Sequence, residues 1–269
     1  MVKEQTKQII SDNLTIKSVF LNRDVLIDCY YSTEYFKQSV ISLLLINDGQ
    51  DLRKMAFDNI LNDAFLEGNI EPVFCVGIHC SVDRKNEYGT ANIVDYKGRG
   101  AKADLYTKFI LEELIPYIRE KYSIISFKEK SFAGFSLGGL SALDIVWNNA
   151  NEFFKVGVFS GSLWWRDKDQ DDITFDESLD RIMHRQVREG NHYPWLKFFF
   201  EVGTQDETAD RNKNGVIDAI DDVVSFIDEL KIKGYKDDSI KYLEIADGKH
   251  DIQTWAKSFP SFLNWAWGK

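Results

Sequence analysis

A serine flanked by glycines is the residue in this sequence whose surroundings most clearly indicate covalent chemistry. Residues 130–143 read KSFAGFSLGGLSAL, an apolar strand pattern that leads through GFSLG at 134–138 into a helix of small residues. A G-x-S-x-G sequence between a strand and a helix is typical of a sharp turn that exposes a nucleophilic hydroxyl, and the glycines avoid Cβ clashes with nearby backbone. We therefore expect Ser136 to be a nucleophile and the backbone N–H of Leu137 to stabilise an oxyanion. A strand-to-helix turn without chemistry is the alternative interpretation.

A serine nucleophile needs a general base, and imidazole is the side chain that takes and returns a proton near neutral pH. The chain has four histidines, which are His79, His184, His192 and His250. In hydrolases of the α/β-hydrolase type the chain order is serine, acid, histidine, and His79 precedes the serine. We expect His184, on a predicted amphipathic helix over 176–189, and His192, in a polar turn, to lie at the surface. His250 follows the last apolar strand in a loop and is the predicted base.

The acid that orients this histidine should lie in the loop after the preceding strand, where the run 196–202 leads into GTQDE at 203–207. Asp206 comes first and is predicted to fix the imidazole tautomer and stabilise its cation. Glu207 and Asp210 stay open as alternatives.

A second oxyanion donor normally follows an earlier central strand. The turn NDGQD at 47–51 occupies that place, and its glycine permits a tight turn. We therefore predict that the backbone N–H of Gln50 faces the substrate oxygen, although an ordinary turn would have the same sequence.

Residues 210–221 read DRNKNGVIDAID and fit the spacing of a calcium loop. Oxygen-bearing side chains stand at positions one, three, five, nine and twelve, which are Asp210, Asn212, Asn214, Asp218 and Asp221. Two features depart from the pattern: Asp221 stands where a glutamate is usual, and a strand and loop precede the loop instead of a helix. As an alternative to calcium binding, Asp218 suits a helix N-cap and Asn214-Gly215 suits a turn. Bound calcium would be structural, because serine hydrolysis needs no metal; no cofactor is required for catalysis.

The elements that must position these groups alternate between short apolar runs and longer helical patterns. Branched or aromatic apolar runs, typical of a parallel sheet covered on both faces, occur at 40–47, 73–78, 130–136, 155–160, 196–202 and 240–246. Helical periodicity covers 102–120, where Pro116 kinks or shortens the helix, and 219–233. Segments 14–20 and 24–31 read as an antiparallel pair. We predict a single α/β-hydrolase domain over 1–269, with a mostly parallel sheet of about eight strands, helices on both faces and a possible small cap at 164–195.

Composition excludes several other classes of protein. A formal net charge of −10 over 269 residues disfavours binding to nucleic acids and anionic membranes. The three cysteines, Cys29, Cys75 and Cys80, fit neither a disulfide framework nor a zinc pattern. No apolar stretch is long enough to span a membrane, and the polar start MVKEQTKQII is unlike a secretory signal, so we expect a cytoplasmic protein. The expected partner is a small-molecule ester, and the oligomeric state stays open.

The chain resembles the putative esterase family related to esterase D, which includes trilactone siderophore esterases, feruloyl esterases and mycolyltransferases. The resemblance covers nearly the whole chain and rests on LINDGQ at 45–50, GTQD at 203–206, GKHD at 248–251 and FSGSLWW at 159–165. It implies an oxyanion role for Gln50 and the acid role for Asp206. A glycine stands at position 161 where relatives commonly have proline.

The same resemblance implies that Trp164, Trp165 and Arg84 contact the substrate. Arg84 lies in VDRKNEY at 82–88, a segment that borders the pocket in relatives. An aromatic and cationic pocket would suit a phenolic or anionic ester. The alternative, equally consistent with the sequence, is that these three side chains pack in the core and at the rim of the pocket.

Together these features predict a serine esterase that cleaves a carboxylic ester through an acyl-enzyme, with siderophore lactones, feruloyl esters and acetylated sugars as candidate substrates. A thioesterase or acyltransferase would use the same triad. A binding protein that kept the fold and lost turnover is the alternative from another class.

Overall fold

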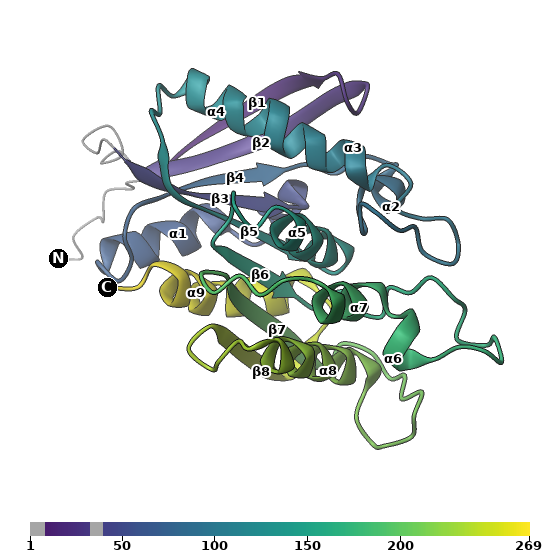
Figure 1. The fold of residues 1–269 in the computed structure, drawn as a ribbon. Coiled ribbons are helices and arrows are strands. Elements are labelled where there is room, and N and C mark those ends of the chain that lie inside the picture. The colour runs from purple at the N-terminus through teal and green to yellow at the C-terminus, as the bar shows by residue number, and fades with distance from the viewer. Residues whose placement is uncertain (1–8, 33–39) are drawn as a thin grey trace.

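The computed structural model describes residues 9–32 and 40–269, which form a twisted sheet with helices on both faces (Figure 1). The polar start of the chain considered above lies almost wholly outside the described residues. The strands of the sheet are β1 (Ile9–Ser18), β2 (Arg23–Ser32), β3 (Ile41–Asn47), β4 (Val73–Ile78), β5 (Phe127–Phe135), β6 (Lys155–Phe159), β7 (Lys197–Gln205) and β8 (Ile240–Lys249). Every strand that the sequence predicts is present, most of them within three residues of their expected ends, whereas β1 begins five residues earlier than the predicted segment 14–20.

The strands lie in the order β1-β2-β4-β3-β5-β6-β7-β8. β1 pairs with β2 and β2 with β4 in antiparallel fashion, and the remaining pairs are parallel. The predicted mostly parallel α/β-hydrolase sheet is therefore confirmed. Such an order requires crossover helices, because parallel neighbours cannot be joined by a tight turn.

The helices cover the sheet in two layers. They are α1 (Phe57–Leu66), α2 (Arg84–Glu87), α3 (Ala103–Lys108), α4 (Ile115–Lys121), α5 (Leu137–Asn148), α6 (Glu177–Asp180), α7 (Ile182–Glu189), α8 (Asp218–Lys233) and α9 (Ile252–Trp267). α1 and α9 lie on one face, while α3, α4, α5, α7 and α8 lie on the other (Figure 1).

Strand β7 shows how alternation divides the core into these two layers. Phe200 packs edge-on against Phe226 of α8, whereas the adjacent Phe199 packs against Phe262 of α9 on the opposite face. Successive side chains of a strand point to opposite faces of the sheet. Because helices cover both faces, both sets of side chains must be apolar. This is the physical reason that the strand sequences are nearly continuous apolar runs.

Two predicted helices are interrupted. The pattern over 102–120 forms α3, then a π-helical turn at Phe109–Leu114, then α4, in which Pro116 occupies the first turn. Proline has no N–H to donate, so the wider turn before it accommodates the missing bond. The pattern over 176–189 forms α6 and α7, separated by Arg181, whose backbone is extended.

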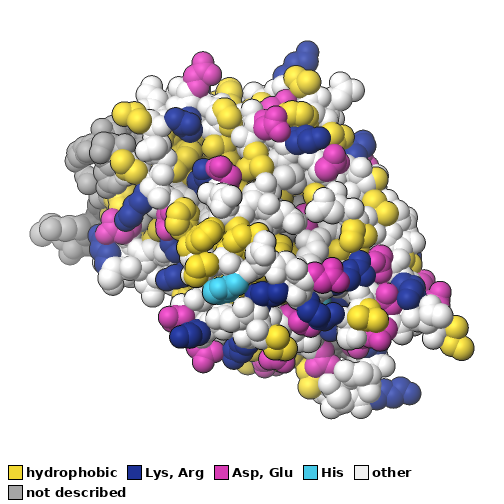
Figure 2. Space-filling view, viewed as in Figure 1, with side chains coloured by type: hydrophobic (Ala, Val, Ile, Leu, Met, Phe, Trp, Pro, Cys, Tyr) yellow, Lys and Arg dark blue, Asp and Glu magenta, His cyan; other side chains and the backbone are white. Residues whose placement is uncertain are grey.

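Charged side chains of both signs cover the part of the surface formed by α6, α8 and their connections (Figure 2). The segment 164–195 lies there, and α7 packs against α8 through the Arg188–Glu229 ion pair. Its assignment as a cap stays a prediction. No helix among the described residues is long and apolar enough to cross a membrane.

The carboxyl ends of the parallel strands meet at one edge of the sheet. The long connections around α2 and α6, and the one before α8, gather at that end (Figure 1). Ser136 follows β5, Asp206 follows β7 and His250 follows β8. Side chains far apart in sequence therefore converge where α/β sheets commonly bind ligands.

Candidate active site

Ser136 lies on a strained turn between β5 and α5. Its backbone has φ 54° and ψ −123°, a conformation that residues with a Cβ rarely adopt. A Cβ on Gly134 would collide with the carbonyl of Gly138, and one on Gly139 would lie 2.9 Å from the Gly134 carbonyl oxygen. The glycines in the motif therefore have the steric function that the sequence indicates.

The first turn of α5 packs directly against the end of β3. The Asn47 amide donates to the Gly138 carbonyl at 2.8 Å, and a Cβ on Gly138 would lie 2.5 Å from Asp48 Oδ2. Leu137 is the first residue of α5, where backbone N–H groups lack intrahelical acceptors. This contact brings the turn after β3, which contains Gln50, beside the serine turn.

The Gln50 side chain forms hydrogen bonds within its own turn and with Cys80. Its amide lies near the carboxylates of Asp48 and Asp51, and its carbonyl accepts the Cys80 N–H at 3.1 Å. It lines a separate groove together with His79. An oxyanion role for Gln50 therefore rests on its backbone N–H alone, as the sequence predicts, and stays a prediction.

Arg84 is held by a carboxylate instead of standing free in the pocket. Its guanidinium donates to both Asp48 oxygens at 2.7 Å and to the Phe135 carbonyl at 3.3 Å. It therefore ties the turn after β3 to the residue just before Ser136. Arg84 does not line the pocket that contains Ser136, so this geometry suits a positioning role better than the predicted substrate contact.

Asp206 and His250 are neighbours at the ends of β7 and β8. Asp206 Oδ2 lies 3.8 Å from His250 Nδ1, close enough for an ion pair but too long for a hydrogen bond. The Asp206 side chain is 1% exposed, whereas that of His250 is 40% exposed. The His250 ring lies edge-on to Trp255, and Asp251 caps α9 by accepting the Thr254 N–H. The start of α9 thus fixes the segment that carries the histidine.

A pocket of about 180 Å³ joins these groups. Its lining includes Ser136, Asp206 and His250, together with Trp164 and Glu207. The structure therefore brings together the three residues that the sequence predicts as a triad. The alternative acid Asp210 does not line this pocket, and Glu207 does so with an exposed side chain.

The pocket wall also includes three residues of the FSGSLWW sequence for which the sequence predicted no role in the site. Ser160, Gly161 and Ser162 follow β6, and the Ser162 N–H donates to the Ser136 carbonyl at 3.2 Å. Ser160 has φ 46° and accepts a hydrogen bond from Trp255 Nε1. The polar FSGS sequence after an apolar strand was the available signal.

The two adjacent tryptophans lie in different environments. Trp164 lines the pocket, whereas Trp165 is fully buried and donates to Thr90 Oγ1 at 3.2 Å. It packs against Gly89 and Gly100, where a Cβ would lie 2.9 Å and 3.3 Å from its ring. The predicted substrate contact of Trp165 is therefore corrected to a core role, because its ring has no exposed surface.

The other histidines lie apart from Ser136. His79 is 2.9 Å from Asp28 in the separate groove beside Gln50. The prediction that His184 lies at the surface is wrong, because its ring is fully buried between Ser225 and Phe226, and burial lowers its pKa well below the usual value. His192 is exposed, as expected.

The cysteines are poor alternative nucleophiles. Cys29 is buried and Cys80 half-buried, and burial raises the pKa of each thiol to about 12. Cys75 is also buried. Thiolate is the reactive form, so thiol chemistry near neutral pH is strongly disfavoured at these positions.

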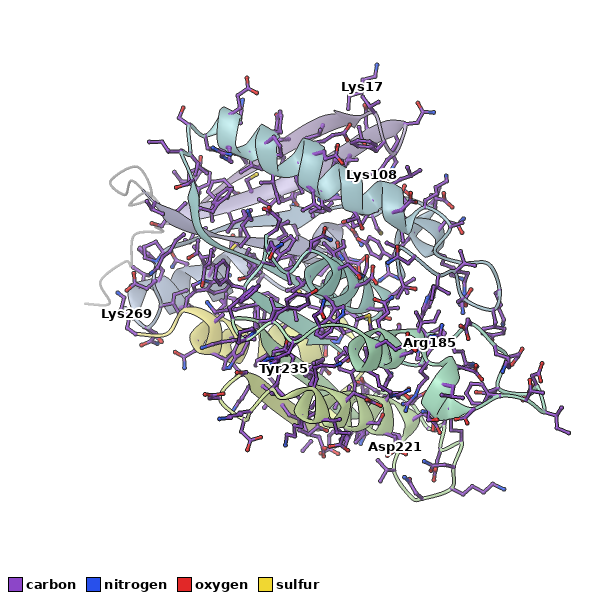
Figure 3. The ribbon with its side chains drawn as sticks, viewed as in Figure 1. Lys17, Lys108, Arg185, Asp221, Tyr235 and Lys269 are labelled. Carbon is purple, nitrogen blue, oxygen red and sulfur yellow. The ribbon has the colours of Figure 1, made fainter. Side chains whose placement is uncertain are left out.

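The polar side chains of the predicted calcium loop form hydrogen bonds with one another. The amides of Asn212 and Asn214 both lie 2.8 Å from Asp221 Oδ2, and Asp210 accepts the N–H groups of Asn214 and Gly215. Figure 3 shows Asp221 where α8 begins, beside this loop. Asp218 differs, because it accepts the Arg211 N–H. Among the described residues, no three His, Cys, Asp or Glu side chains converge closely enough to hold a metal.

Known proteins are similar to this chain in sequence or in fold. The chain is 22% identical to the uncharacterized protein YbbA of Bacillus subtilis over 83% of this chain and 84% of that protein. A ferulic acid esterase structure aligns at a TM-score of 0.70 and 16% identity over 96% of this chain and 97% of its own. The enterobactin esterase FES from Shigella flexneri aligns at 0.74 and 18% identity, over 95% of this chain and 58% of its own.

A family model described as "Putative esterase" matches residues 18–266. These residues include all the groups described above, from the turn after β3 to the start of α9. The chain therefore belongs to the putative esterase family, and it is a carboxylic ester hydrolase with the α/β-hydrolase fold.

Proposed function

We propose that the protein hydrolyses its ester through an acyl-enzyme formed on Ser136, with His250 as base and Asp206 as the acid that orients it. The observation that carries this proposal is the strained backbone of Ser136 in a pocket that also contains His250, with the Asp206 carboxylate behind the imidazole. A non-glycine residue at positive φ persists only where the surrounding structure holds it.

The proposed reaction has two halves. Ser136 Oγ attacks the ester carbonyl while His250 takes the hydroxyl proton, and the oxyanion is stabilised by the N–H groups of Leu137 and Gln50. His250 then protonates the leaving alcohol. Water attacks the acyl-enzyme by the same route, and the acid product leaves. The 3.8 Å separation of His250 and Asp206 must shorten in this cycle, as catalytic hydrogen bonds often do on substrate binding.

A second depression adjoins the triad pocket, and its lining favours a substrate with an aryl group. Trp164 and Glu207 line both, and the second encloses about 360 Å³. Arg166 lines it with its guanidinium over the rings of Tyr96, Trp164 and Phe175, at 5.1, 5.8 and 5.9 Å. Aromatic faces of this kind accommodate both a cation and a further aromatic group.

Arg166 differs from the two neighbouring arginines in this depression. Arg99 pairs with buried Asp95, and Arg211 pairs with Asp222 and Glu177. No carboxylate among the described residues pairs with Arg166, and its Nε is buried without an acceptor. A phenolate or carboxylate on the substrate would pair with the guanidinium charge, whose Nη1 otherwise donates to the Trp164 carbonyl at 3.5 Å. Among the substrates that the sequence suggests, this favours feruloyl and catechol-bearing lactone esters over acetylated sugars.

The names of two structural neighbours, a ferulic acid esterase and an enterobactin esterase, agree with an aryl ester. The test compares hydrolysis of methyl ferulate, an aryl trilactone, an acetylated xylo-oligosaccharide and an aryl thioester by the wild type and by Ser136→Ala. We expect the two oxygen esters with aryl groups to give the highest kcat/KM, and the variant to be inactive. A preference for the thioester would support the thioesterase alternative.

The alternative of a binding protein without turnover predicts a different result. Such a protein would neither hydrolyse p-nitrophenyl acetate nor be labelled at Ser136 by a fluorophosphonate. Labelling that disappears in Ser136→Ala and in His250→Ala would instead support the triad, because the serine needs its base to react.

We also propose that the loop 210–221 binds Ca²⁺ through the convergent side chains of Asn212, Asn214 and Asp221, with Asp210. Oxygen ligands from such a loop suit a hard cation. To present their oxygens to Ca²⁺, the two amides would exchange the hydrogen bonds that they now make to Asp221 and to the N–H groups of Asn214 and Val216 for bonds to the ion. Bound calcium would stabilise the segment between Asp206 and α8 and take no part in hydrolysis.

A further inference from the structure

Glu201 is a fully buried carboxyl group in the middle of β7 that the proposed reaction does not use. It pairs in register with Phe159 of β6 on one side and Leu243 of β8 on the other, and its side chain has no exposed surface. A glutamate is rarely buried in this way unless it is paired, because removing a charge from water is costly.

The Asp206 carboxylate lies over the same strip of β7. Residues two apart on a strand face the same side, so Glu201 and Gly203 share a face. Asp206 Oδ1 is 2.6 Å from the position that a Cβ on Gly203 would occupy. The absence of a side chain at position 203 thus allows the Asp206 carboxylate to fold back beside Glu201.

Hydrogen-bond donors are scarce around the two carboxyl groups. All four oxygens of Glu201 and Asp206 are buried and lack a partner among the described residues. Burial and the charge of Asp206 raise the pKa of Glu201 to about 8, against the opposing effect of the Ser160 amide. Two adjacent buried carboxylates cannot both ionise at neutral pH, and such pairs share one proton.

The surroundings supply little positive charge to the pair. The neighbouring residues are uncharged: Phe159 and Ser160 at the end of β6, Trp255 of α9, and Tyr242 of β8, whose phenol interacts with Glu201. His250 is the titratable base that faces the pair, and it does so from the side of Asp206.

We propose that Glu201 holds the shared proton of this pair and acts as a positioning residue, so that Asp206 is the single negative charge behind His250. This inference rests on the proposed triad. The neutral Glu201 carboxyl is a hydrogen-bond donor for Asp206, directly or through a buried water, and stays protonated while the proton of Ser136 moves to His250 and back. Ionisation of Glu201 places a second charge beside Asp206, and the repulsion moves the Asp206 carboxylate away from His250.

The test combines infrared spectroscopy with kinetics, using wild type, Glu201→Gln and Glu244→Gln. Glu244 is an exposed carboxylate on the adjacent strand β8 and is the matched control. We expect a protonated-carboxyl carbonyl band at pH 6.5 in the wild type and in Glu244→Gln that is absent from Glu201→Gln. The band should titrate away near pH 8 in the wild type and at a lower pH in Asp206→Asn, which removes the neighbouring charge.

The pH profile of kcat/KM tests the positioning role. We expect wild type and Glu244→Gln to lose activity above about pH 8, whereas Glu201→Gln, which keeps a neutral donor, should lack that loss and stay within about threefold of wild type at pH 6.5. Glu201→Leu, which has no donor, should lower kcat at every pH.

The proposal is overturned if Glu201→Gln leaves the infrared band unchanged, or if its pH profile matches that of the wild type. A band that behaves as expected in a protein without esterase activity would sink the proposed triad while leaving the proton assignment intact. The two proposals can therefore fail separately.

Discussion

Arg84 joins the two turns that we propose to form the oxyanion site, by donating to both Asp48 oxygens at 2.7 Å and to the Phe135 carbonyl at 3.3 Å. The chain contains a matched pair elsewhere, in which Arg23 donates two hydrogen bonds to Glu87. Both arginines hold a carboxylate that is nearly buried. The first pair adjoins Ser136 and the second does not.

This comparison gives the first prediction. Arg84→Gln and Arg23→Gln should each lower the free energy of unfolding by about 2–4 kcal/mol, because each leaves a poorly solvated carboxylate unpaired. Arg84→Gln alone should also lower kcat, by about 10-fold or more, through displacement of the turn that carries Gln50. Urea unfolding and steady-state kinetics measure the two effects. An increase in KM for an anionic ester with kcat unchanged would instead restore Arg84 as a substrate contact.

Removal of the charge behind His250 gives the second prediction. Asp206→Asn should lower kcat by about 10²–10⁴-fold with little effect on stability, because the imidazole loses its orienting carboxylate. Asp247→Asn, in the exposed neighbouring turn, is the control and should behave like the wild type. Full activity of Asp206→Asn would transfer the acid role to Glu207, which lines the same pocket.

The third prediction concerns Arg166 and the depression next to the triad. Arg166→Gln should raise KM about 10-fold for a phenolic or carboxylated aryl ester, and should not change kinetics with p-nitrophenyl acetate, which carries no anionic group. Arg185→Gln is the matched control, because Arg185 pairs with Asp167 on the same segment. Equal KM changes for both esters would show that Arg166 acts through packing against Trp164 alone.

The fourth prediction is a pH dependence of stability. The pKa of Glu201 is about 8 in the folded protein and near 4.5 when the chain is unfolded. The unfolded chain therefore releases this proton first. The contribution of Glu201 to folding stability is fully present below about pH 4.5 and is lost as the pH rises toward 8. This group should remove about 2–3 kcal/mol of unfolding free energy between pH 5 and pH 7.

Glu201→Gln isolates this contribution, because glutamine cannot ionise. The difference in unfolding free energy between variant and wild type should grow in favour of the variant from pH 5 to pH 8, as measured in urea. A constant difference across that range would mean that Glu201 ionises normally in the folded protein.

Calcium binding gives the fifth prediction. Addition of Ca²⁺ at 100 times its dissociation constant should raise the unfolding free energy by about 2.7 kcal/mol, and chelation should reverse the change. Asp221→Asn should abolish the response, whereas Asp172→Asn, in another exposed loop, should retain it. No Ca²⁺-dependent change in melting temperature would remove the metal proposal without affecting the triad.

The sequence alone determined the strands along the chain and the helical segments 102–120 and 219–233, because apolar runs and helical periodicity reflect which faces are covered; α1 and α9 were not predicted. It also indicated Ser136, Asp206 and His250, since each follows a predicted strand at the carboxyl edge of a parallel sheet. Local pattern was sufficient there, because strand ends and tight turns constrain residue type within a few positions.

The tertiary structure alone decided what the neighbouring side chains contact. Trp164 reaches the pocket and Trp165 is buried, although the two are adjacent and identical in type. Arg84 is held by Asp48, His184 is buried against Phe226, and Glu201 lies beside Asp206 only because Gly203 leaves room. Each of these outcomes depends on contacts between segments distant in sequence, and no local periodicity encodes which partner a side chain meets.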